Sequence, residues 1–136
     1  MPASSQRTSK PPAKPRAKRL AKSSSPSSRP FLRFYHSESL REKTLAVLTA
    51  LEKAKDKTDH RDALADIVVE LTDSGMEYYF LRPLKIAKAG FLTEQSANLG
   101  MAATTRVLGT VIRNVIGRMD SPQLLSVRSY IRQLMR

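Results

Sequence analysis

The residues of this chain that could carry catalysis or bind a metal ion are few. The 136-residue sequence contains two histidines and no cysteine. Asp56 and His60 have the i, i+4 spacing of paired ligands on a helix, beside the stretch "DHRD" at residues 59–62. One histidine among carboxylates is a weak transition-metal site, whereas aspartates are favoured at the positive end of a helix dipole. We interpret this stretch as a helix start and predict no metal site.

Other chemical signatures are also missing from the sequence. It contains no glycine-rich phosphate loop, no nucleophile motif and no paired-carboxylate signature. His36 stands beside Phe34 and Tyr35, which indicates a packing or hinge contact and not a ligand. We therefore predict no catalytic residues, no cofactor and no enzymatic activity.

Charge is the strongest feature of the chain. Its 24 Lys and Arg against 12 Asp and Glu give a formal charge of +12, which predicts polyanionic partners. Residues 1–30 hold eight bases and no acid, and residues 78–136 hold nine bases and two acids. Residues 31–77 are acidic, with seven bases and ten acids. The chain thus has two basic regions separated by an acidic one.

The basic residues define a candidate polyanion-binding set in two parts. In the first 30 residues the set comprises Lys10, Lys14, Arg16, Lys18, Arg19 and Lys22. In the second half it comprises Arg82, Lys85 and Lys88 around Pro83, Arg106 and Arg113 seven apart, and Arg128 and Arg132, which with Arg136 are spaced to line one outer helix face. Arginine can give bidentate phosphate contacts, although a solvated bundle exterior also carries such charges.

The aromatic run "EYYFLRP" at residues 77–83 could stack nucleic-acid bases if it were exposed. Helical spacing places Tyr79 and Phe80 on a core stripe, which leaves Tyr78 as the more exposed candidate. The stretch "RPFLRFYH" at residues 29–36 is expected to dock on the folded body, with contact to a lipid surface as the alternative.

Composition divides the chain into three parts. Residues 1–30 include eight Ser and six Pro besides the eight bases, so they cannot bury enough apolar surface to offset the entropy of ordering. We predict a disordered basic arm over 1–30, an aromatic docking linker over 31–36 and a helical bundle domain over 37–136. The most apolar window, residues 99–117, contains Arg106 and Arg113, which excludes a transmembrane span there.

The apolar spacing from residue 37 onward is helical throughout and predicts an all-α, compact bundle of about five helices. Ser39 with Glu42 forms a candidate capping box, and Asp120 or Ser121 with Pro122 announces the last helix. Gly75 and Gly117 are expected to end helices, and Pro83 to kink or break one near Leu81 and Arg82.

The expected helices cover residues 37–55, 58–75, 76–90, about 94–116 and 121 onward. The fourth is the longest and most apolar, so we expect it at the centre of the bundle. Its expected buried stripe is Ala97, Met101, Thr104, Leu108, Val111, Ile112 and Val115. In the last helix, Leu124, Val127, Ile131 and Leu134 form the expected stripe.

Three functions remain open at this point. The first is a nucleic-acid-associated protein, cytoplasmic or nucleoid-associated, that contacts phosphates without strong sequence specificity. The second is a helical scaffold or regulatory module that binds a protein partner or forms a homodimer. The third is peripheral attachment to an anionic membrane or granule surface through the charged arm.

Overall fold

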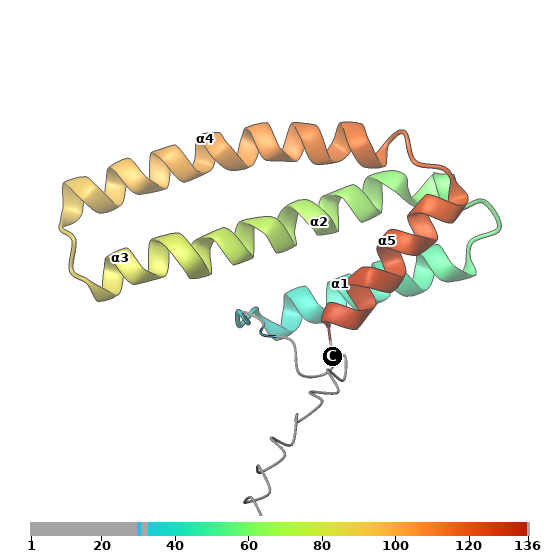
Figure 1. Ribbon diagram of the computed structural model, residues 1–136, viewed down its shortest axis with the longest axis horizontal. Coiled ribbons are helices and arrows are strands. Elements are labelled where there is room, and N and C mark those ends of the chain that lie inside the picture. The colour runs from blue at the N-terminus through green and yellow to red at the C-terminus, as the bar shows by residue number, and fades with distance from the viewer. Residues whose placement is uncertain (1–29, 31–32, 136) are drawn as a thin grey trace, which may run out of the picture. The chain divides into compact units, whose positions relative to one another are not determined.

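The computed structural model describes Pro30 and residues 33–135, and every regular element in that part of the chain is helical (Figure 1). The predicted all-α class is confirmed. The chain divides into two units, residues 1–32 and 33–136, and we call the described part of the second unit the helical body. The six candidate bases of the first 30 residues lie outside the described residues, as does Arg136.

The helical body contains four helical segments. The first is α1 (Glu38–Lys53), followed by a 3-10 turn (Lys57–His60). The second runs without interruption from α2 (Arg61–Met76) through a π-helical turn (Glu77–Leu81) into α3 (Arg82–Ile86). The third and fourth are α4 (Phe91–Ile116) and α5 (Ser121–Leu134). Two of the expected five helices are therefore joined into one.

The predicted helix end at Gly75 is wrong, because the backbone remains helical past it. Phe34 packs on this glycine, where a Cβ atom would lie 3.7 Å from the Phe34 ring. Pro83 disturbs the helix as expected, but without a break. Proline has no N–H and its ring crowds the carbonyl one turn earlier. The π-helical turn widens the helix just before Pro83. There the Arg82 N–H donates to the carbonyl of Glu77, five residues earlier, and not to the residue four earlier as in an α-helix.

Of four further helix boundaries predicted from the sequence, two are confirmed and two are wrong. Asp120 caps α5 in a reciprocal capping box with Gln123, and α4 ends at Ile116 before Gly117. The box predicted at Ser39 is wrong, because the Ser37 side chain accepts the Leu40 N–H at 3.1 Å and caps α1. The start of α4 is also earlier than expected, at Phe91.

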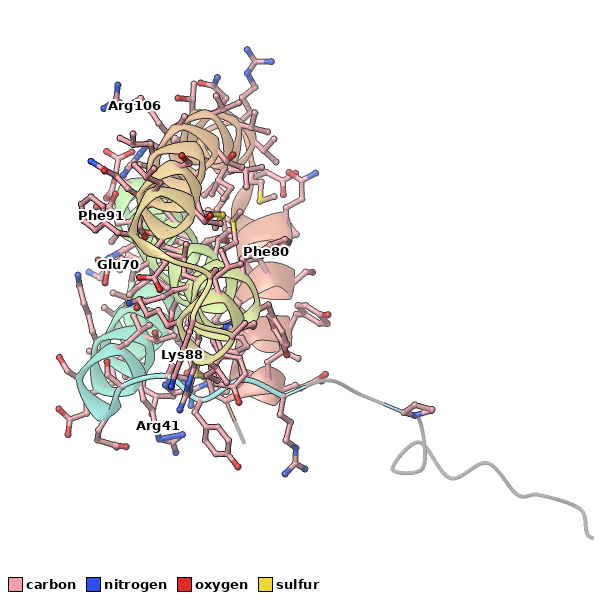
Figure 2. All side chains as sticks on the ribbon, turned by 90° about the vertical axis from the view of Figure 1, so that its left-hand side faces the viewer. Arg41, Glu70, Phe80, Lys88, Phe91 and Arg106 are labelled. Atoms are coloured by element: carbon pink, nitrogen blue, oxygen red, sulfur yellow. The ribbon has the colours of Figure 1, made fainter. Side chains whose placement is uncertain are left out.

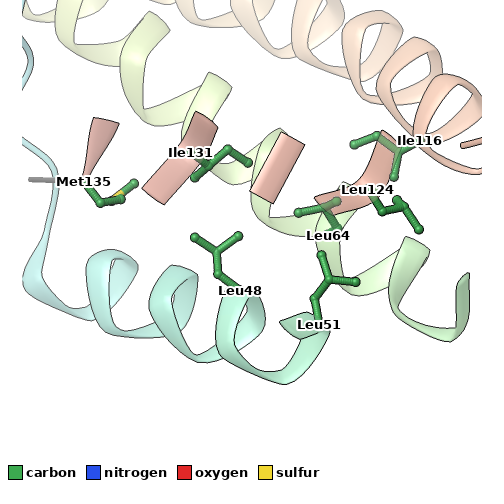
Figure 3. Close-up of a cluster of buried hydrophobic side chains, with 8 residues drawn as sticks. Leu48, Leu51, Leu64, Ile116, Leu124, Ile131 and Met135 are labelled. Carbon is green, nitrogen blue, oxygen red and sulfur yellow. The ribbon is translucent and has the colours of Figure 1, made fainter. Parts of the chain in front are cut away.

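The buried core lies where α1, α5, the start of α2 and the end of α4 meet (Figure 3). Thr44, Leu48, Leu51, Leu64, Ile67 and Leu124 are fully buried. Ile116, the last residue of α4, closes this core from the side of the long helices. Burial of each such leucine or isoleucine stabilises the fold by about 1.5–3 kcal/mol, so the stability of the body is concentrated at this end.

The prediction that α4 forms the centre of the bundle is wrong. Only Gly109 and Ile116 of α4 are buried, and Val111 and Val115 of the expected stripe are 51% and 52% exposed. α4 packs mainly along α2, as Figure 1 shows, whereas α1 also packs on α2 and α5 packs on α1 and the 3-10 turn. A single long neighbour can bury only one narrow stripe of a helix.

A similar correction applies to the end of α5. Leu134 is 64% exposed, and Met135 takes the buried position beside Ile131.

Candidate nucleic-acid interface

The π-helical turn and α3 place an aromatic residue and two bases on one side of the second helical segment. Tyr78, Arg82 and Lys85 follow one another at intervals of four and three residues, so they are neighbours on a helix surface. The Arg82 guanidinium lies over the Tyr78 ring, 5.2 Å from its centroid. This cation–π contact orients the arginine while leaving it exposed.

The residues that precede α1 contribute a second aromatic side chain to the same place. Phe34 anchors them, with its ring centroid 6.3 Å from that of Tyr78 and 6.2 Å from that of Tyr79. Tyr35 follows, with its centroid 6.2 Å from the Tyr78 ring. Tyr35 is 81% exposed, so most of its ring surface is open to solvent.

These side chains surround a hollow of about 470 Å³, which we call the tyrosine–arginine pocket. It is lined by Tyr35, His36, Ser37, Ser74, Glu77, Tyr78, Arg82 and Lys85. An exposed tyrosine ring is a stacking surface for a planar base, and two neighbouring cations are contacts for phosphates. Among the described residues, the pocket therefore combines the groups that binding of single-stranded nucleic acid requires.

The exposure of the "EYYFLRP" run differs from the expectation. Tyr78 is partly buried, whereas Tyr79 is 40% and Phe80 is 60% exposed. The reason is that Phe34, Tyr35 and Arg82 cover Tyr78. Tyr35 is not among the binding residues predicted from the sequence. The feature of the sequence that could have indicated it is its position between the basic arm and the first helix.

The three bases around Pro83 are all exposed at one end of the body. Arg82 and Lys85 line the tyrosine–arginine pocket, and Lys88 lies in the loop between α3 and α4. Figure 2, which looks onto this end of the body, shows Lys88 there. None of the ion pairs found among the described residues involves these three side chains.

Arg106 and Arg113 on α4 have different surroundings. Arg106 is exposed and lines a separate hollow of about 850 Å³ that also holds Lys43, Glu70 and Asp73. Lys43 pairs with Glu70 across this hollow, so its charge is largely compensated. Arg113 pairs with Asp66 of α2. The structure thus brings neither residue to the tyrosine–arginine pocket.

The spacing of Arg128 and Arg132 predicted that they line an outer face of the bundle. In the structure they do not. Arg128 pairs with Glu52 of α1, and its side chain is only 17% exposed. Arg132 lies 3.7 Å from the same carboxylate and donates to the Thr49 hydroxyl at 3.3 Å. Their shared helix face packs on α1, so both guanidinium groups bridge two helices and face an acid.

The Asp56–His60 stretch has the helix-start role that its sequence indicates. The Asp56 carboxylate accepts hydrogen bonds from the hydroxyl and the N–H of Thr58 and caps the 3-10 turn. These bonds, with the charge of Arg61, hold the pKa of Asp56 below its ordinary value. Among the described residues, no three His, Cys, Asp or Glu side chains gather into a group that could hold a metal ion.

None of the described helices combines the length and the apolar character needed to cross a bilayer.

No protein-family model matches this chain, and comparisons with curated proteins and with solved structures likewise found no match.

Proposed function

We propose that this protein is a non-enzymatic, nucleic-acid-associated protein that binds single strands through the tyrosine–arginine pocket and the basic arm. The observation that supports this best is the meeting of Tyr35 and Tyr78 with Arg82 and Lys85 around one hollow. Stacking on an exposed aromatic ring contributes about 1–3 kcal/mol per base, and it is available only for unpaired bases.

The basic arm extends this site along the sequence. Arg33 lies two residues before Tyr35 in the sequence, and residues 1–30 hold eight bases without an acid. Neutralisation of a row of phosphates releases condensed counterions and gives a salt-dependent affinity. The pocket would hold a base and its phosphates, and the bases of the arm would add to the salt-dependent part of the affinity.

Binding of this kind is expected to have little sequence specificity. A single stacking surface accepts every base, because every base has a π-face. Contacts from arginine and lysine to phosphates carry no direct sequence information. The proposed location is accordingly the cytoplasm or the nucleoid, where nucleic acid is abundant.

The test is a titration of the full chain with a single-stranded homopolymer and a duplex at two salt concentrations. We expect tighter binding of the single strand, and a log–log salt slope of about −0.7 for every phosphate neutralised. Tyr35→Ala should weaken single-strand binding about 5- to 100-fold, because it removes the stacking surface.

Tyr130→Ala is the matched control, because Tyr130 is also an exposed tyrosine, at 63%, but lies on α5 and does not line the pocket. It should leave the affinity unchanged. Equal losses for the two variants, or equal binding of single strand and duplex by the wild type, would contradict the proposed function.

The second candidate function is association with a second copy of the chain, and the outer face of α4 favours it. The outer face of α4 is the exposed side of this helix. It consists of Leu92, Leu99, Gly100, Ala103, Val107 and Val111. None of the six is charged, although the whole chain carries +12. An equally uncharged face on a second copy would cover it without burying a charge.

A further inference from the structure

Three large apolar side chains are exposed at the end of the body where α3 joins α4. Ile86 is the last residue of α3, and Phe91 and Leu92 are the first two of α4. Their side chains are 74%, 78% and 77% exposed. Figure 2 looks onto this end and shows Phe91 projecting away from the body. We call these three residues the apolar tip. Apolar surface gathered at one place in this way indicates an interaction site.

The loop that carries the apolar tip is short and internally hydrogen-bonded. Only residues 87–90 separate α3 from α4. The Ala87 N–H donates to the Pro83 carbonyl at 2.8 Å, and the Ala89 N–H donates to the Leu84 carbonyl at 3.1 Å. Lys88 and Gly90 turn the chain with φ angles of 51° and 93°. The N–H groups of residues 87–89 thus donate to carbonyls of α3, while the apolar side chains face solvent.

Exposed bases accompany the apolar tip. Arg82 and Lys85 lie on α3 and Lys88 lies in the loop, and all three are exposed. The sequence has no acid between Glu77 and Glu94. This is unlike the other end of the body, where Arg128 and Arg132 face Glu52. The α3–α4 end therefore combines apolar side chains with three exposed bases that form no ion pair among the described residues, and Glu77 and Glu94 lie at its borders.

We propose that the apolar tip inserts into the interface of an anionic membrane, with Lys85 and Lys88 beside the lipid headgroups. Interfacial binding of proteins combines apolar side chains placed at the headgroup–acyl boundary with bases attracted to anionic lipids. The tip offers both. A nucleic acid would attract the same bases, but Ile86 and Leu92 offer no planar ring on which a base can stack. This site goes beyond the proposed function and does not rest on it.

The absence of tryptophan from the chain allows a direct test. Leu92→Trp introduces a single fluorescent probe at the tip, where the side chain is exposed and makes little packing contact. The variant is mixed with vesicles of phosphatidylcholine containing about 30% phosphatidylglycerol, at about 150 mM salt. We expect its emission to shift to shorter wavelength on binding, because the indole leaves water.

Tyr130→Trp is the matched control. Tyr130 is also exposed, at 63%, but it lies on α5, outside both the apolar tip and the outer face of α4. Its emission should stay unchanged with the same vesicles. In the Leu92→Trp background, Lys85→Glu with Lys88→Glu should lower the vesicle affinity about 25-fold or more, because each base near an anionic surface contributes about fivefold.

Four results would overturn the inference. The first is vesicle binding by Leu92→Trp without an emission shift, and the second is an equal shift for the two tryptophan variants. The third is an affinity for pure phosphatidylcholine vesicles equal to that for vesicles with phosphatidylglycerol. The fourth is an emission shift that single-stranded homopolymer causes and vesicles do not. The last result would support the proposed function while removing the membrane site. Conversely, loss of homopolymer binding in Tyr35→Ala would leave the vesicle result unaffected, so the two proposals can fail separately.

Discussion

The two ends of the helical body are built on different principles. At one end, α1, α5, the start of α2 and the end of α4 enclose Leu48, Leu51, Leu64 and Leu124, all fully buried. At the other end, α3 packs mainly on the adjoining π-helical turn, and neither α1 nor α5 extends to the start of α4 (Figure 1). Ile86, Phe91 and Leu92 are about three-quarters exposed there. We call these regions the packed end and the open end.

Charge follows the same division. At the packed end, Arg128 and Arg132 share Glu52, and Arg41 donates to the Met135 carbonyl at 2.8 Å. At the open end, Arg82 rests on Tyr78, and Lys85 and Lys88 are exposed. The packed end thus uses its bases to join helices, whereas the open end leaves them free to meet an anion. The two ends have the same kinds of residues, but the packed end pairs its bases with an acid and the open end leaves them exposed.

The largest expected effect comes from truncating equivalent leucines at the two ends. Leu64→Ala at the packed end should lower the free energy of unfolding by about 2–5 kcal/mol, because it leaves a cavity in a fully buried cluster. Leu99→Ala on α4, at a side chain that is 68% exposed, should change it by about 0.5 kcal/mol or less. Denaturant unfolding followed by circular dichroism measures both. Similar losses would show that the open end is covered in solution.

The sequence predicts much of the packed end. The apolar spacing of α5 identified Leu124 and Ile131 as core residues, and they are buried. The cap of α5 followed from Asp120 and Pro122, since capping depends on a few residues that are close in the chain. Local chemistry of this kind can be read without knowledge of the tertiary contacts.

The open end could not be predicted in the same way. Periodicity shows which residues of α4 share a face, but the number of helices that cover this face depends on tertiary packing. Val111 and Val115 were expected in the core and are half exposed for that reason. The continuation of α2 past Gly75 depends on the π-helical turn before Pro83, which has no simple sequence signature.

The candidate site was predicted in part. Arg82 and Lys85 were recognised as neighbours from their spacing, and both line the tyrosine–arginine pocket. Tyr35 comes from a distant part of the sequence, and only the docking of Phe34 on Gly75 brings it to them. The charges of Arg113, Arg128 and Arg132 were evident in the sequence, but their acidic partners on α1 and α2 were not.

The next effect concerns the paired charges of the packed end. Glu52→Gln removes the negative charge beside Arg128, whose guanidinium is largely removed from solvent. We expect a loss of about 1–2 kcal/mol of stability, below the 3–5 kcal/mol of a fully buried pair because Glu52 is half exposed. Glu70→Gln is the matched control, because its pair with Lys43 is about half exposed on both sides. That variant should cost less than about 1 kcal/mol. If the two variants were equally stable, Arg128 would not depend on Glu52.

The smallest expected effect is the change in stability on replacing two glycines by alanine, one within α4 and one at its C-terminal cap. At Gly100, on the outer face of α4, a Cβ atom would meet no atom within 4 Å. Gly100→Ala should therefore stabilise the monomer by up to about 1 kcal/mol, the difference in helix propensity. At Gly117 a Cβ atom would lie 2.8 Å from the Arg113 carbonyl oxygen, so Gly117→Ala should destabilise it. Thermal unfolding at low protein concentration compares the two signs.

Gly100 also tests whether the outer face of α4 is open to solvent or covered by a second copy of the chain. At Gly109 a Cβ atom would make an ordinary packing contact with Val69 of α2 at 3.7 Å, whereas at Gly100 it would meet no atom of the described chain within 4 Å. A glycine that costs helix propensity without a local contact is explained if another helix approaches closely at that point. Light scattering over a range of concentrations should then show a dimer for the wild type and weaker association for Gly100→Ala. A monomer at all concentrations, with Gly100→Ala simply more stable, would leave the outer face of α4 open and exclude the second copy as its occupant.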